Sequence, residues 1–201
     1  MDPRVQAQLA EAAASEDAAL SAVRSRAGAD ADLPSPPVGA LLAWTAATIA
    51  AKHVVELGSA AGLTALWMLR GLAPRGLITS IERDPRTQSL EMRAYDEAGA
   101  GDRVRSILSD PLAVLPRLSD HAYDLCVVQT NGLEYPRYLE HALRLLRPGG
   151  VLVVRGVSAG EGGDGRGRRV LANDVADAPD LIATVLDIDG GLLLATVRDQ
   201  G

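Results

Sequence analysis

Two acidic residues and a pair of glycines are spaced as a nucleoside-binding site requires. Glu56 lies two positions before Gly58 in the run ELGSAAG, which Gly62 ends. Glycines allow a sharp turn and a close approach of a ligand, and an acid beside them suits a ligand with a cationic amine and a sulfonium. Glu82 follows the next apolar run. Its separation from Gly58 is close to the roughly 20 residues expected of an acid that binds the ribose hydroxyls.

These signals each have a simpler interpretation. The glycine run lacks the spacing G-x-G-x-x-G of a dinucleotide fingerprint, and a plain strand-to-helix turn would also contain glycine. Glu82 could be a solvated acid at a strand end, but its spacing from the glycine run favours a role in binding a nucleoside. The pair Ser109-Asp110 follows a third apolar run. It could bond an adenine amino group, or Asp110 could cap the helix that Pro111 begins.

A sheet must bring these residues together, and the chain from residue 52 onward alternates apolar runs with helical patterns. Five such units predict a Rossmann-like, doubly wound α/β fold with a mostly parallel sheet of seven strands. A hairpin signal at 188–191 makes the last two strands antiparallel. Ligands of such sheets bind at the carboxyl ends of the strands. The strands are predicted at 53–57, 76–82, 103–108, 123–129, 150–156, 181–187 and 192–198, and the helices between them at 63–72, 85–98, 111–118 and 135–146.

The chain divides into an N-terminal helical extension, residues 1–32, and an α/β domain, residues 33–201. Residues 3–27 are expected to be helical, with Ser15 as the N-cap of a second piece and Gly28 as its end. A further helix is expected over 38–51. Trp67 and Trp44 are expected to pack between helices, although Trp44 could reach the edge of the pocket. The segment 156–168 is rich in glycine, which predicts a mobile loop.

The composition disfavours several classes of function. A net charge of −6 over 201 residues argues against binding to a nucleic-acid backbone. The lone cysteine, Cys126, rules out an internal disulfide framework and a thiolate zinc site. No apolar run has the length of a membrane span, and the N-terminus lacks the basic start of a signal peptide. We therefore expect a cytoplasmic protein that binds neither nucleic acid nor membrane.

The sequence resembles the small S-adenosylmethionine-dependent O-methyltransferases of the catechol and caffeoyl-coenzyme A type. The resemblance covers residues 33–198 and rests on VVELGSAAGLTALWML (54–69), ITSIERD (78–84) and YLEHALRLLRPGGVLVV (138–154). It implies S-adenosylmethionine as cofactor, a small-molecule methyl acceptor and a homodimer. Apolar faces on the alanine-rich N-terminal helices also favour the dimer.

The resemblance also implies roles for individual residues. Glu82 would hold the ribose, with Arg83 beside it. Ser109 and Asp110 would face the adenine, and Gln129 would lie near the cofactor amine. The full set of cofactor-binding residues implied is Glu56, Gly58, Ala60, Gly62, Thr64, Glu82, Arg83, Ser109, Asp110 and Gln129.

The sequence departs from this family at the metal site. Its members usually hold a divalent cation with an aspartate after the fourth strand and an Asp-Asn pair after the fifth, and a lysine shortly after the first aspartate often serves as the base. The positions here read Gln129, Gly132, Arg155 and Gly156. Mg²⁺ prefers anionic oxygen ligands, whereas Arg155 would put a fixed positive charge there. We therefore expect no metal.

Arg155 and Gln129 are the candidate catalytic residues that remain. Arg155 could replace the charge of the metal and stabilise a phenolate, or it could bind a carboxylate substrate. A salt-bridging arginine at a strand end is the alternative interpretation.

These residues are compatible with two functions. One is metal-independent methylation of a small hydroxylated or carboxylated molecule. The other is a cofactor-binding sensor or scaffold with little or no turnover, which the missing metal ligands and base would favour. A nicotinamide-dependent oxidoreductase is disfavoured, because the glycine spacing is wrong and no Tyr-x-x-x-Lys pair exists.

Overall fold

The computed structural model describes residues 14–29, 31–129, 134–157 and 178–199, together with the single residues Val5, Gln8, Ala12 and Val175. Three predictions therefore lie wholly or largely outside the described residues. They are the helix over 3–13, the Gly132 position, and the glycine-rich loop from residue 158 to residue 168.

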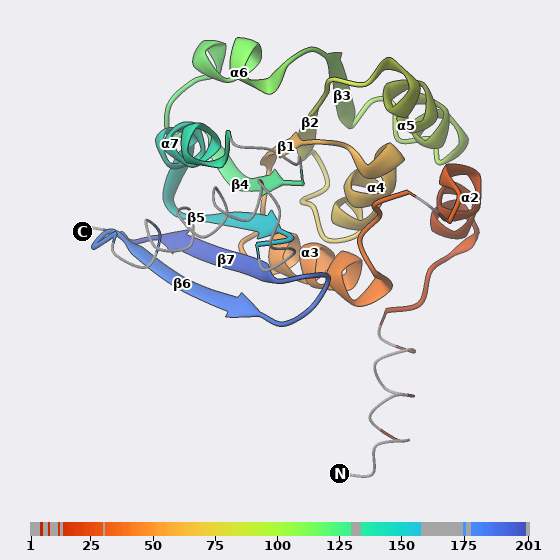
Figure 1. The fold of residues 1–201 in the computed structure, drawn as a ribbon, viewed down its shortest axis with the longest axis horizontal. Coiled ribbons are helices and arrows are strands. Elements are labelled where there is room, and N and C mark those ends of the chain that lie inside the picture. The colour runs from red at the N-terminus through yellow and green to blue at the C-terminus, as the bar shows by residue number, and fades with distance from the viewer. Residues whose placement is uncertain are drawn as a thin grey trace.

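Seven strands form one sheet in the order β3-β2-β1-β4-β5-β7-β6 (Figure 1). Strands β1 to β5 are parallel to one another, and β7 lies antiparallel between β5 and β6. The predicted doubly wound sheet with a C-terminal antiparallel hairpin is confirmed. The strands are β1 (His53–Leu57), β2 (Leu77–Glu82), β3 (Val104–Leu108), β4 (Tyr123–Val128), β5 (Leu146–Arg155), β6 (Leu181–Leu186) and β7 (Leu192–Val197).

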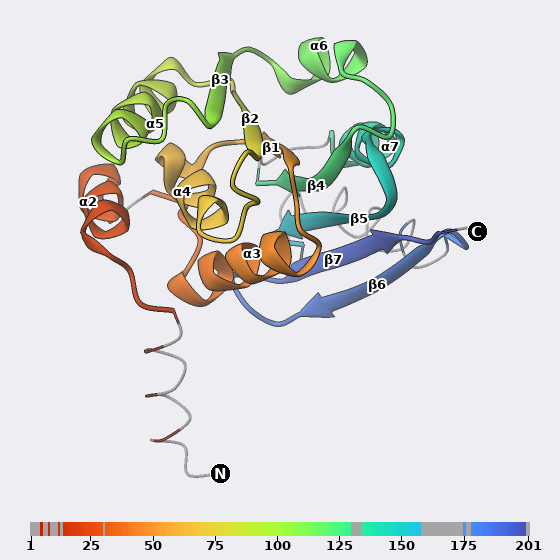
Figure 2. The ribbon, with the colours of Figure 1, turned by 180° about the vertical axis from the view of Figure 1, so that it is seen from behind.

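The helices cover both faces of the sheet, and β3 and β6 form its two edges (Figure 2). One face packs against α2, α3, α4 and α5, and the other against α7 and the short turn η2. The described helical elements are α2 (Ala18–Ala27), α3 (Pro36–Thr48), η1 (Ala60–Gly62), α4 (Leu63–Leu69), α5 (Pro85–Glu97), α6 (Pro111–Val114), η2 (Leu115–Arg117) and α7 (Tyr135–Leu145).

Alternation along the strands builds the two cores. On β1, Val54 packs with the helices of the first face, and Val55 packs with α7 on the second. Successive side chains of a strand point to opposite faces, so β1 contributes apolar side chains to both cores, with the buried acid Glu56 among them. Cys126 on β4 is fully buried, and this burial raises the pKa of its thiol to about 12. It is therefore an inert part of the core.

Close packing of α3 on α4 fixes the first face. A Cβ atom at Gly71 would lie 1.9 Å from the carbonyl oxygen of Ala43, so only glycine fits where the end of α4 meets α3. Trp67 of α4 is buried, whereas Trp44 of α3 is 64% exposed. The prediction that Trp44 packs between helices is therefore wrong.

Two element boundaries also differ from expectation. Asp17, not Ser15, caps α2, because its side chain accepts a hydrogen bond from the amide of Leu20; Gly28 ends this helix as predicted. Strand β5 begins at Leu146, since Leu146 already pairs with Tyr123 across an irregular register.

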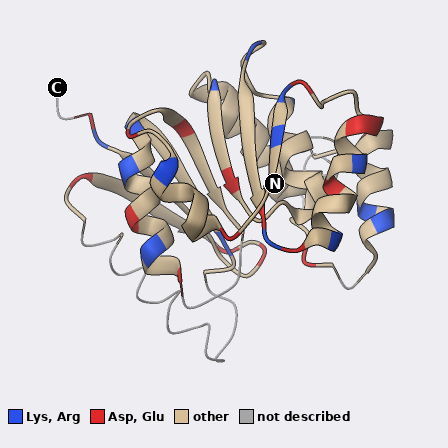
Figure 3. Cartoon of the chain, turned by 90° about the horizontal axis from the view of Figure 1, so that it is seen from above, with Lys and Arg blue, Asp and Glu red and all other residues tan. Residues whose placement is uncertain are grey.

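The exposed helices carry both signs of charge. Acidic and basic residues are interspersed along them (Figure 3). Within the described part of the chain, no helix is long and apolar enough to cross a bilayer.

Candidate functional site

A pocket of about 460 Å³ lies at the carboxyl ends of β1, β2 and β4. The strand order reverses between β1 and β4, and open α/β sheets bind ligands at such a reversal. The pocket is lined by Ala27, Ala31, Asp32, Leu33, Gly58, Ser59, Ala60, Ala61, Ile81, Glu82, Arg83, Thr87, Leu90, Pro111 and Gln129.

The loop after β1 turns through left-handed backbone. The φ angles are +82° at Gly58, +46° at Ala60, +56° at Ala61 and +88° at Gly62. The two alanines are strained there, because their Cβ atoms crowd the following carbonyl. A Cβ atom at Gly62 would come within 3.1 Å of the Cα of Glu91 on α5. The loop therefore packs tightly on α5 and presents its backbone to the pocket.

Glu82 holds two segments of the pocket wall together. Its Oε2 accepts hydrogen bonds from the amide and the hydroxyl of Ser59, at 3.0 and 3.1 Å. Its Oε1 accepts from the amides of Arg83 and Asp84, at 2.8 and 2.9 Å. The Ser59 hydroxyl is the one of these four donors that can rotate away and let a ligand hydroxyl take its place.

Gln129, directly after β4, has a side chain whose orientation is fixed by its neighbours. Its Nε2 lies 2.7 Å from the Thr64 hydroxyl, 3.2 Å from Oε1 of Glu56 and 3.2 Å from the carbonyl of Gly58. The carbonyl of Gly58 can only accept, so the amide nitrogen of Gln129 must face it. Gln129 Oε1 is buried without a hydrogen-bond partner among the described residues, in a side chain that lines the pocket.

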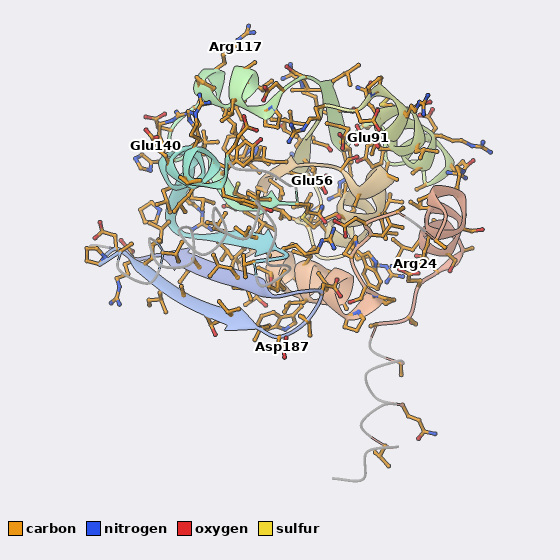
Figure 4. The ribbon with its side chains drawn as sticks, in the orientation of Figure 1. Arg24, Glu56, Glu91, Arg117, Glu140 and Asp187 are labelled. Atoms are coloured by element: carbon orange, nitrogen blue, oxygen red, sulfur yellow. The ribbon has the colours of Figure 1, made fainter. Side chains whose placement is uncertain are left out.

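Acidic side chains lie beneath the pocket. Glu56 and Glu91 are in the interior, between the sheet and helices α4 and α5 (Figure 4). Burial, followed by the nearby carboxyl of Glu91, raises the pKa of Glu56 well above its ordinary value. Burial also raises the pKa of Glu91. Oε2 of Glu56 and the hydroxyl of Tyr95 are buried without hydrogen-bond partners in the described structure.

Arg155 ends β5 and pairs with the segment between α2 and α3. Its Nη1 lies 2.8 Å from Oδ1 of Asp32, and its Nη2 lies 2.9 Å from the Asp32 carbonyl. Val154 pairs with Val128 in the sheet, so Arg155 and Gln129 are the next residues on two adjacent parallel strands. They point to the same face because strand side chains alternate.

This arrangement is a poor site for a divalent cation. Gln129 offers one neutral oxygen, and a cationic residue, Arg155, follows the adjacent strand at the same level, whereas Mg²⁺ needs several hard oxygen ligands. Among the described residues, no cluster of three or more His, Cys, Asp or Glu side chains is arranged to hold a metal.

The structure brings most of the predicted site residues together. Glu56, Gly62 and Thr64 are buried behind the wall. Asp110 is exposed and accepts from the Leu112 amide at 2.9 Å, so it does cap α6. Neither Asp110 nor Ser109 lines the pocket itself. The predicted cofactor-binding residues that do line it are Gly58, Ala60, Glu82, Arg83 and Gln129.

Sequence reasoning missed the part of the pocket lining formed by Ala27 and residues 31–33. The proline-rich stretch 31–37 predicts only extended or turned backbone, and nothing local in it points to a pocket. Asp32 meets Arg155 from 123 positions away, a pairing that the sequence does not encode in any short pattern. Ser59 and Ala61 could have been predicted as pocket residues, because they lie between Gly58 and Gly62, the two glycines predicted to bind the cofactor.

Comparison with known proteins agrees with this geometry. A model of the O-methyltransferase family matches residues 32–162. A proposed O-methyltransferase of Mycobacteroides abscessus is 40% identical over 197 residues, covering 93% of this chain and 92% of that protein. A solved structure from Corynebacterium glutamicum has a TM-score of 0.88 at 27% identity and covers 98% of both chains. The O-methyltransferase TomG of Streptomyces achromogenes, involved in tomaymycin synthesis and solved in complex with S-adenosylmethionine, has a TM-score of 0.82 at 28% identity, covering 92% of this chain and 91% of its own.

Proposed function

Because this chain belongs to the O-methyltransferase family, we propose that it moves a methyl group from S-adenosylmethionine to an oxygen of a small hydroxylated or carboxylated molecule. One observation carries the assignment of the cofactor site. A pocket at the reversal of strand order combines a glycine-containing loop, a carboxylate at Glu82 and the buried acceptor oxygen of Gln129.

The cofactor fits this pocket by chemical type. Glu82 binds a ribose hydroxyl in place of the Ser59 hydroxyl, with Arg83 beside it. The ammonium group of the methionine end donates to Gln129 Oε1, which has no other donor within the described residues. Glu56 and Thr64 act behind Gln129 by fixing its amide. Gly58, Ala60 and Gly62 shape the loop.

The adenine end of the cofactor is the least enclosed in this pocket. It lies toward Pro111, which lines the pocket. Ser109 and Asp110 stand at the neighbouring rim, where the Ser109 hydroxyl can reach the adenine amino group. Asp110 is already engaged in capping α6, so we assign it a supporting role.

The transfer is an in-line displacement that the cofactor's own chemistry makes possible. A lone pair of the acceptor oxygen forms a bond to the methyl carbon, and the bond from that carbon to sulfur breaks. Sulfur keeps the electron pair, so the sulfonium becomes a neutral thioether. The proton of an acceptor hydroxyl passes to solvent water. The protein contributes alignment of the two reactants.

We propose that the reaction runs without a divalent metal. The guanidinium of Arg155 supplies positive charge at the acceptor end of the site, beside Gln129. Its charge favours loss of the acceptor's proton, because it stabilises negative charge on the acceptor oxygen before the bond to the methyl carbon forms. Calorimetric titration with Mg²⁺ should give no heat from this site. Tight binding that disappears in Gln129→Ala would contradict the proposal.

Transfer of a labelled methyl group tests the activity. The protein is incubated with methyl-labelled S-adenosylmethionine and a panel of phenols and carboxylic acids, and labelled products are separated. We expect transfer to at least one acceptor, with loss of transfer in Arg155→Ala. Cofactor binding without transfer to any acceptor would instead indicate a binding protein with no catalysis.

We also propose a homodimer located in the cytoplasm. Apolar side chains gather on α3 and the β6–β7 hairpin, where Trp44 is 64% and Ile182 is 56% exposed. A second copy of the chain would cover this surface. A single buried cysteine, Cys126, is in keeping with a reducing compartment.

A further inference from the structure

Arg155 is the cationic group that we assign to the acceptor end of the site, and an internal carboxylate, that of Asp32, already pairs with it. Both terminal nitrogens of its guanidinium bond to Asp32, one to Oδ1 at 2.8 Å and the other to the backbone carbonyl at 2.9 Å. The Arg155 side chain is only 9% exposed, whereas that of Asp32 is 64% exposed. Asp32 therefore stands between the guanidinium and the solvent.

Asp32 is held in this position from a second direction. Three residues further along, the amide of Ser35 donates to Oδ2 of Asp189 in the β6–β7 turn at 2.7 Å. The segment 31–35 is thus tied to the ends of two strands. Asp32 and Leu33 belong to the lining of the pocket, whereas Arg155 does not, so a ligand in the pocket meets Asp32 before it meets Arg155.

A planar guanidinium binds a carboxylate best through two parallel N–H donors. Here Asp32 takes one donor from each terminal nitrogen, and this negatively charged residue is itself part of the pocket lining. A carboxylate ligand would have to displace Asp32 and would be repelled by it on the way in. A neutral hydroxyl meets no such repulsion and needs only one donor. Arg155 Nε is buried and has no hydrogen-bond partner among the described residues.

From these contacts we infer that Asp32 is a specificity-determining residue, which fills the carboxylate-binding edge of Arg155 and restricts the methyl acceptors to hydroxyl compounds. The inference rests on the proposed function, and it narrows the substrate class from hydroxylated or carboxylated molecules to hydroxylated ones. Removing the Asp32 side chain should open Arg155 to carboxylates.

Benzoate and phenol are suitable probes, because they share a ring and differ in the polar group. Each is titrated by calorimetry into the protein saturated with S-adenosylhomocysteine. We expect the wild type to prefer phenol. In Asp32→Ala, affinity for benzoate should rise about tenfold or more, as a charge-assisted contact is gained, while affinity for phenol changes little.

A matched control removes a similar ion pair elsewhere. Asp120 is 60% exposed and pairs with Arg144, ahead of β4 at the opposite end of the sheet. Asp120→Ala should leave affinity for both probes unchanged. An equal gain of benzoate affinity in Asp120→Ala would overturn the inference, and so would unchanged benzoate affinity in Asp32→Ala.

Asp32→Asn serves if Asp32→Ala fails to fold. It keeps an acceptor oxygen for Nη1 and removes the charge that repels a carboxylate. Benzoate affinity above that of the wild type is expected, and no gain would overturn the inference. Titration of S-adenosylhomocysteine alone separates the two proposals. Its failure to bind contradicts the proposed function, whereas its binding together with unchanged benzoate affinity contradicts only the role of Asp32.

Discussion

The side-chain amide of Gln129, directly after β4, donates a hydrogen bond to Oε1 of Glu56 on β1 across 3.2 Å. This contact joins the two strands between which the order of the sheet reverses. It places a neutral side chain beside a buried acid and leaves the buried Gln129 carbonyl oxygen without a donor among the described residues. The orientation of Gln129 in the proposed cofactor site is therefore fixed by a residue, Glu56, that no ligand needs to contact.

Replacing Gln129 with methionine tests this support. Gln129→Met keeps the length of the side chain but removes the donor to Glu56, Thr64 and Gly58. We expect the free energy of unfolding to fall by about 1–3 kcal/mol, because buried acceptors lose their partner. Urea unfolding measures the change. Gln88→Met, which removes a single half-buried bond to Ser106, should cost less; equal costs would contradict the account.

The pH dependence of stability tests the buried acid. Burial and the carboxyls of Glu91 and Glu82 raise the pKa of Glu56 well above 4.5. The native state therefore binds this proton more tightly than the unfolded state. The stabilisation is full below pH 4.5 and is lost as the pH rises through the raised pKa.

Glu56→Gln cannot titrate at this position, and it retains an oxygen that can accept from Gln129. Between about pH 5 and about pH 8, its free energy of unfolding should fall less steeply with pH than that of the wild type. Part of the slope should remain, because burial also raises the pKa of Glu91. Identical slopes in urea unfolding would show that Glu56 is charged in the native state.

Backbone strain in the loop gives a further prediction. Ala60 has a φ of +46°, which costs a residue with a Cβ atom about 1–2 kcal/mol. Ala60→Gly should relieve this strain and raise the free energy of unfolding by about 0.5–1 kcal/mol after the entropic cost of glycine. Ala47→Gly, at an exposed position within α3, should lower it by a similar amount. Destabilisation by both variants would argue against strain at Ala60.

The proposed dimer predicts a clear change of mass. Trp44 and Ile182 line one apolar groove of about 270 Å³. Trp44→Glu would bury a charge without a partner in the interface, so light scattering should report a monomer where the wild type is a dimer. Met92→Glu, at a residue of α5 that is 45% exposed, should remain dimeric. A monomeric wild type would contradict the proposal.

The fold could be predicted because each strand and helix carries a local signal. Apolar runs and helical periods alternate from residue 53 onward, and the antiparallel hairpin has its own turn residues. Boundaries failed where two local signals compete. Ser15 and Asp17 are both good N-cap residues, and only the hydrogen bond to Leu20 shows which one caps α2.

Within the site, strand ends were predictable and the opposite wall was not. Glu82 and Gln129 follow apolar strands directly, so the parallel sheet places them at one edge. Asp32 follows no strand, and its partner Arg155 is distant in sequence. The neutral Gln129 is compatible with its place beside Glu56 only because it donates to that acid, a contact that spacing alone does not show.

The most direct test is calorimetric titration of the full chain with S-adenosylhomocysteine, for the wild type and for Glu82→Ala. Asp84→Ala, which removes the exposed cap of α5, serves as the control. The account predicts binding at one site and a loss of about 1–3 kcal/mol in Glu82→Ala, with the affinity of Asp84→Ala unchanged. Absence of binding to the folded wild-type protein would contradict the central claim, and unchanged affinity in Glu82→Ala would remove Glu82 from the cofactor site.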